Sequence, residues 1–60
     1  MDIEKRISDI YANGAMIEYE VSTESGLVKG LRTVNGYLVK IVYERIERGN
    51  KIILNPTKIF

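Results

Sequence analysis

The sequence predicts a mainly β fold, a small antiparallel barrel or strongly bent sheet of about five strands with one N-terminal α-helix. Three observations lead to this prediction. Apolar residues recur at helical spacing in the first twelve positions, they alternate with polar residues from position 15, and short turn signals divide the alternating part. We expect the chain to form a single domain over residues 1–60.

The first segment repeats at the spacing of an α-helix, with apolar residues at Ile3, Ile7, Ile10 and Tyr11. Asp2 is a residue type that caps helix starts, and Asn13-Gly14 tolerates the left-handed conformation found at helix ends. These signals predict a helix over 3–12. Because so short a helix is marginal alone in water, it must dock its isoleucine face on the rest of the chain.

Five strands are expected, over 15–22, 27–34, 37–46, 51–54 and 58–60. Turns are expected at Thr23–Gly26, at Asn35-Gly36 and at Glu47–Asn50. Asn35-Gly36 predicts a two-residue type I′ turn, in which both residues take positive φ.

Two further residues shape the predicted sheet. Gly30 lies inside a strand pattern and indicates a bulge or a sharp bend there. Pro56 is expected to end the fourth strand, because proline cannot donate a hydrogen bond to a neighbouring strand.

A helix is the rival interpretation for 37–48, because Leu38, Ile41 and Val42 also share a helical face. Valine, isoleucine and tyrosine dominate 37–43, however, and these residues favour strands. The segment also follows a hairpin turn directly, so we favour the strand.

The order of one helix, short antiparallel strands, a glycine bend and a proline turn resembles small SH3-like and Sm-like barrels. The segment IILNPTKIF is similar to the strand, short turn and closing strand at the end of SH3-like barrels. The resemblance implies a closed barrel and indicates little about function, since one fold serves many functions.

The strand expected at 37–46 is apolar on both faces. One face carries Tyr37, Val39, Ile41 and Tyr43, and the other carries Leu38, Val42 and Ile46. Soluble monomers rarely expose an apolar stripe. We therefore expect a barrel or folded-over sheet to bury the first face, and the helix or a second copy of the chain to bury Leu38 and Val42.

Enzymatic function is not expected, because the sequence has no histidine and no cysteine and so lacks the usual general base and the strongest nucleophile. Glu18 and Glu20 are interpreted as a solvated pair. Neither a metal site nor a cofactor is predicted. A cytoplasmic location is expected, because small secreted domains usually carry disulfides and no signal peptide or membrane span stands out.

Charge divides unevenly along the chain. Residues 1–26 contain two basic and six acidic residues, a net −4, whereas 27–60 contain seven basic and two acidic residues, a net +5. The predicted nucleic-acid-binding residues lie around two hairpins of the basic half: Lys29, Arg32, Lys40, Arg45, Arg48 and Lys51. Such a patch would bind DNA or RNA through phosphate neutralisation.

Two alternatives stay open beside this prediction. Tyr37 and Tyr43 would stack on bases if exposed, but core positions are favoured because they share a face with Ile41. The chain is alternatively a protein-interaction or homo-oligomeric assembly module. Its acidic and basic halves, its apolar strand surface and its sheet edges would then meet across an interface.

Overall fold

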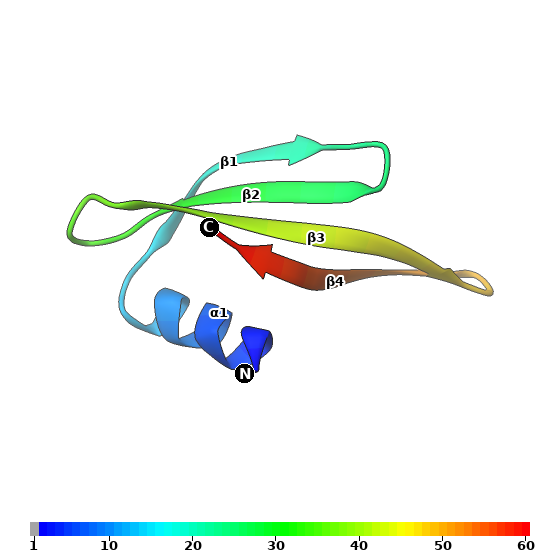
Figure 1. Ribbon diagram of the computed structural model, residues 1–60, viewed down its shortest axis with the longest axis horizontal. Helices are drawn as coiled ribbons and strands as arrows, with labels where there is room; N and C mark the ends of the chain where they lie inside the picture. The colour runs from blue at the N-terminus through cyan, green and yellow to red at the C-terminus, as the bar shows by residue number, and fades with distance from the viewer. Residues whose placement is uncertain (1) are drawn as a thin grey trace.

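The computed structural model describes residues 2–60 as one helix followed by a four-stranded antiparallel sheet (Figure 1). The elements are α1 (Ile3–Ala12), β1 (Met16–Ser22), β2 (Gly26–Arg32), β3 (Leu38–Arg48) and β4 (Lys51–Ile59). The strands lie in the order β1-β2-β3-β4, so each pairs with the next and the sheet stays open. The mainly β prediction is confirmed. Of the two predicted arrangements, a barrel or a bent sheet, the closed barrel is wrong, because β1 and β4 do not pair.

The predicted helix over 3–12 is confirmed. The Asp2 carboxylate accepts hydrogen bonds from the backbone N–H groups of Glu4 and Lys5, at 3.1 and 3.4 Å. At the other end Gly14 has φ +96°, which favours glycine and turns the chain toward β1. The helix is therefore capped at its start and stopped by a glycine, as its sequence indicates.

The segment 51–54 and most of 58–60 belong to a single strand, β4, so the prediction that Pro56 ends a strand is wrong, and four strands form within residues 2–60. Pro56 pairs with Tyr43 where the register shifts between Val42 and Tyr43. Here β4 has one extra residue, Thr57, whose hydroxyl donates to the Val42 carbonyl at 3.2 Å. Proline is tolerated because it lies at a bulge on an edge strand.

The hairpin between β2 and β3 has a longer turn than predicted. The Gly36 N–H donates to the Thr33 carbonyl at 2.9 Å, and the Thr33 N–H donates to the Tyr37 carbonyl at 2.8 Å. Gly36 has φ +88°, and no non-glycine residue of 2–60 has positive φ. The turn is therefore a three-residue loop closed by a glycine bulge, not a type I′ turn. Strand β3 accordingly begins at Leu38 and not at Tyr37.

The irregularity indicated by Gly30 lies opposite it, in β1. The β1–β2 register shifts between Ile17 and Tyr19, which makes Glu18 the extra residue. Tyr19 pairs with Gly30, and its ring lies where a Cβ atom of residue 30 would be. Glycine is therefore required by close approach of a ring.

Helix α1 packs on one face of the sheet and forms a small core there. The buried apolar residues are Ile7, Ala15, Leu31 and Ile41, with Leu31 and Ile41 fully inaccessible. Val39 and Ile59 pack against this cluster from the same face. We call this side the helix face.

The opposite side, which we call the open face, carries Val28, Leu38, Lys40, Val42 and Lys58. No helix of residues 2–60 covers it. Of the two alternatives for burying Leu38 and Val42, the helix is therefore wrong, and a second copy of the chain stays a prediction. Leu38 is 38% exposed and Val42 is half-buried. The helix instead covers Val39 and Ile41, which the prediction assigned to a barrel interior.

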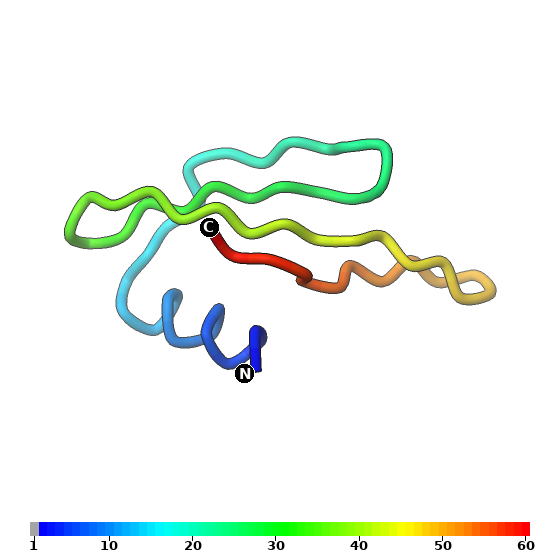
Figure 2. The backbone as a smooth tube through the Cα atoms, viewed as in Figure 1, coloured from blue at the N-terminus to red at the C-terminus, as the bar shows by residue number. Residues whose placement is uncertain are grey.

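Strands β3 and β4 extend beyond the other two as a two-stranded arm (Figures 1 and 2). The last β2 partner of β3 is Gly26, opposite Glu44. Beyond it, the Arg45 N–H still donates to the Ser25 carbonyl at 2.8 Å. We call residues 46–53 the arm, because their neighbours in the sheet lie only within β3 and β4.

Candidate nucleic-acid interface

Four basic side chains lie on the open face of β3 and β4 in two groups, one near Val42 and one at the tip of the arm. Strand β3 alternates without interruption, so Lys40 and Arg48 lie on the same side as Val42. Their neighbours on β4 include Lys58, opposite Val42, and Lys51, opposite Arg48. All four basic side chains are exposed. We call them the basic stripe: Lys40, Arg48, Lys51 and Lys58.

The tip of the arm brings two like charges together. Arg48 and Lys51 are direct cross-strand partners on either side of the Gly49-Asn50 loop. Gly49 takes φ +60°, which lets two residues reverse the chain. No ion pair within residues 2–60 includes a member of the basic stripe. Glu44 is the acidic residue on the open face of these two strands.

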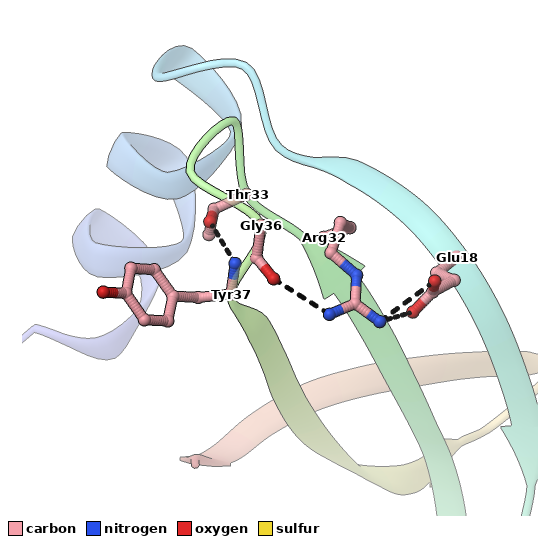
Figure 3. Close-up of polar contacts among 5 residues, drawn as sticks. All are labelled: Glu18, Arg32, Thr33, Gly36 and Tyr37. Carbon is pink, nitrogen blue, oxygen red and sulfur yellow. Dashed lines mark hydrogen bonds and ion pairs between the residues drawn. The ribbon is translucent and has the colours of Figure 1, made fainter.

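Arg32 lies on the open face but is occupied by contacts within the chain (Figure 3). Its Nη2 donates to both carboxylate oxygens of Glu18, at 2.8 and 3.1 Å, and its Nη1 donates to the Gly36 carbonyl at 3.0 Å. The residue therefore ties the bulge of β1 to the β2–β3 turn. Its charge is offset by Glu18, so it adds little to a positive surface.

Lys29 and Arg45 lie on the helix face, away from the basic stripe. The Lys29 ammonium is 3.9 Å from a carboxylate oxygen of Glu20 and 5.2 Å from the centre of the Tyr43 ring. Arg45 donates to the Glu24 carbonyl at 3.1 Å. The six predicted basic residues therefore do not share one surface. Lys40, Arg48 and Lys51 lie on the open face, with Arg48 opposite Lys51 at the arm tip and Lys40 eight residues earlier on β3.

The two tyrosines considered for base stacking differ in position. Tyr43 is half-buried on the helix face beneath Lys29. Burial raises the pKa of its hydroxyl, and the nearby Tyr11 hydroxyl and Glu20 carboxylate raise it further. Tyr37 is 71% exposed, and Figure 3 shows its ring pointing away from Arg32. Neither ring lies on the open face, so neither of these two tyrosines is placed to stack on a base bound there.

Sequence reasoning missed Lys58, because 58–60 was interpreted as a separate closing strand. No local signal assigns Lys58 to the open face, because unbroken alternation from Pro56 would place it opposite Ile41 on the helix face. The extra residue Thr57 moves it opposite Val42. Its ammonium lies 5.5 Å from the centre of the Phe60 ring, which holds it near the C-terminal end of β4.

The described residues offer little for other kinds of site. A shallow hollow between the end of α1 and the β2–β3 turn is lined by Ile10, Ala15, Val34 and Tyr37, together with polar uncharged residues. Within residues 2–60 no group of three acidic side chains could hold a metal ion. Over the same residues, the helix lacks the length and apolar content needed to cross a bilayer.

Comparison of the chain with models of protein families, with curated proteins and with solved structures gave no match.

Proposed function

We propose that the chain is a non-enzymatic binding domain for nucleic acid and that it contacts phosphates through the basic stripe. The observation that carries the proposal is the pairing of Arg48 with Lys51 at the arm tip, on the same face as Lys40 and Lys58. DNA and RNA attract such a surface because bound cations displace condensed counterions.

The like-charge pair at the tip favours an anionic ligand on energetic grounds. Like charges directly opposite one another in a sheet are destabilising, and favourable cross-strand pairs contribute only about 0.2–1 kcal/mol. Arg48 and Lys51 have no acidic partner among the described ion pairs. A phosphate bound between them would turn the repulsion into two charge-assisted hydrogen bonds.

The shape of the arm suits a duplex groove. Two antiparallel strands form a ribbon, and the major groove of B-DNA, about 12 Å wide, admits a two-stranded ribbon. The arm, residues 46–53, is such a ribbon and projects from the body of the molecule (Figure 2). Arg48 and Lys51 at its tip would then meet phosphates along the groove walls, while Lys40 and Lys58 follow the backbone outside.

The salt dependence of binding tests the proposal. If all four members of the basic stripe contact a DNA duplex, log K should fall against log salt with a slope of about −3.6, because each contact contributes about 0.9. The double variant R48Q/K51Q should lower the magnitude of this slope by about 1.8. Because phosphate contacts position a protein without reading bases, the loss should be similar for different sequences.

Two single variants form a matched pair, each removing one exposed lysine from a different part of the molecule. K51Q acts on the basic stripe, and K5Q removes the same charge from α1. The proposal predicts that K51Q lowers the slope by about 0.9 and that K5Q leaves it unchanged. Equal effects of the two variants would contradict it. So would failure of the chain to bind duplex and single-stranded oligonucleotides at 50 mM salt.

A protein-interaction or assembly module is the second candidate, and the uncovered apolar residues of the open face favour it. Leu38 is 38% exposed, Val21 is 51% exposed and Met16 is 75% exposed, while residues 2–60 bury only four apolar side chains. A partner on the open face would cover Leu38 and Val42. The solution mass measured with and without L38K tests this candidate, since a polar residue there should reduce association.

A further inference from the structure

The outer edge of β4 carries an exposed apolar run that begins in the arm and continues one residue beyond it. Ile52, Ile53 and Leu54 are 66%, 44% and 43% exposed. Because β4 is the last strand of the sheet, its outer side has no neighbouring strand within residues 2–60. We propose that a second copy of the chain pairs with this edge, antiparallel and centred on Ile53. This interface goes beyond the proposed binding of nucleic acid and does not depend on it.

The remaining sheet edges carry features that hinder strand pairing. Strand β1 is interrupted by its bulge and presents Glu18 and Glu20, so two copies would bring carboxylates together. The rest of β4 contains Pro56 and Lys58, which are typical protections of an edge. The run Ile52–Leu54 has no proline, charge or bulge. It is therefore the least protected stretch of the β1 and β4 edges. The outer side of β3 in the arm is also unpaired, but it carries the charged residues Glu47 and Arg48.

The backbone of this run points outward at the positions that pairing requires. The Arg45 N–H donates to Ser25, on the side away from β4, so Arg45 and Leu54 are not a hydrogen-bonded pair. Bonded and non-bonded pairs alternate along an antiparallel ladder. Ile53 accordingly bonds to β3, and the backbone groups of Ile52 and Leu54 face outward, free to bond a further strand.

The proposed register is self-complementary. With Ile53 opposite its own copy, Ile52 lies opposite Leu54, and Lys51 lies opposite Asn55. Ile52 and Leu54 would exchange hydrogen bonds, and no charged residue would oppose a like charge. The same surface meets itself across a two-fold axis, so the assembly closes as a dimer and does not propagate into a filament.

A second copy also meets a structural need of the arm. An isolated two-stranded hairpin is at best marginally stable in water, whereas three or more strands support one another. Residues 46–53 have no third strand within the chain. Pairing across Ile53 would make the two arms the centre of one eight-stranded sheet, with both open faces on the same side.

Cysteine cross-linking tests the register directly. The chain contains no cysteine, so a single introduced thiol reports one contact. The residues of a non-bonded antiparallel pair have Cα atoms about 4.5 Å apart, a separation that disulfides span. I53C should therefore oxidise rapidly to a disulfide-linked dimer. V21C is the control, because it lies on the same face but on the β1 edge.

The proposal predicts that I53C cross-links at least tenfold faster than V21C at equal concentration, in the absence of nucleic acid. Equal rates, faster cross-linking of V21C, or no cross-linking of either variant would overturn it. Circular dichroism of each reduced variant establishes that the chain is folded before oxidation.

Solution mass provides the second test. The chain has a mass of 6.9 kDa, so sedimentation equilibrium separates monomer from dimer readily. I53K places two ammonium groups opposite each other and should weaken the association at least tenfold, whereas V21K should associate like the unmodified chain. A monomeric unmodified chain at 1 mM would contradict the proposal. A dimer that survives I53K but is lost in L38K would place the interface on the open face instead.

Discussion

The close approach of Tyr19 to Gly30 predicts that G30A destabilises the chain when Tyr19 is present and stabilises it when Tyr19 is replaced by alanine. A Cβ added at residue 30 would lie 2.6 Å from Cδ1 of Tyr19 and closer still to two other ring carbons. Ordinary contacts between carbon atoms are about 3.5–4.0 Å. In G30A the ring must therefore move by about 1 Å or more and lose part of its contact with the sheet.

The expected magnitude combines two opposing effects. Forcing extra volume into a packed site costs about 1–3 kcal/mol. Gly30 does not have positive φ, so alanine fits its backbone and should stabilise the chain by about 0.4–1 kcal/mol through the unfolded state. We expect G30A to lower the free energy of unfolding by about 1–2 kcal/mol. In a Y19A background the steric cost disappears, and the same substitution should be stabilising.

Urea denaturation of the four chains measures this cycle: the unmodified chain, G30A, Y19A and the double variant. The coupling between the two positions should be about 1–3 kcal/mol, within the range for residues in contact. For a chain of this size, 1 kcal/mol corresponds to a shift in Tm of about 4–8 °C. If G30A were destabilising by the same amount with and without Tyr19, steric contact with the ring would not explain the glycine.

Two further predictions concern the helix face. I41A removes a fully buried side chain and should lower the free energy of unfolding by about 2–5 kcal/mol, whereas M16A, at a position 75% exposed, should change it by less than about 0.5 kcal/mol in chemical denaturation. The raised pKa of Tyr43 means that the folded chain holds this proton more tightly than the unfolded chain, in which tyrosine titrates near 10. The contribution of this proton to stability should therefore be fully present below about pH 10 and be lost as pH rises through the folded-state pKa. Y43F should remove part of this loss of stability at high pH. An identical decline in both chains would refute the assignment to Tyr43.

The helix and the order of strands could be predicted from the sequence because the signals are local. Asp2 and Gly14 lie at the ends of α1, and the alternation of apolar residues identifies the strands. Barrel closure could not be predicted in this way. It depends on whether β1 and β4 meet, and no local pattern encodes that contact.

The loop between β2 and β3 is one residue longer than predicted, and this difference decides which face of β2 meets the helix. A two-residue turn at Asn35-Gly36 would pair Arg32 with Val39, whereas the observed three-residue loop pairs Leu31 with Val39. A shift of one residue moves every side chain of a strand to the other face. The longer loop therefore places Leu31 on the side of Ile41 and completes the core under α1.

The alternation of side chains between the two faces of the sheet also decides which of the predicted basic residues lie on the same face. Alternation along β3 could have assigned Lys40 and Arg48 to one face and Arg45 to the other, since their numbers differ in parity. The pairing of Arg32 with Glu18 could not have been foreseen, because it depends on the bulge in β1. Long-range register, more than residue type, decides which charges are available.

Backbone amide chemical shifts in a titration with a short DNA duplex at 50 mM salt locate the binding surface residue by residue. If the basic stripe binds phosphates, the largest changes should occur at Lys40, Arg48, Lys51 and Lys58, with α1 unaffected. Changes concentrated in α1, or no change at millimolar duplex, would contradict a nucleic-acid surface on the open face.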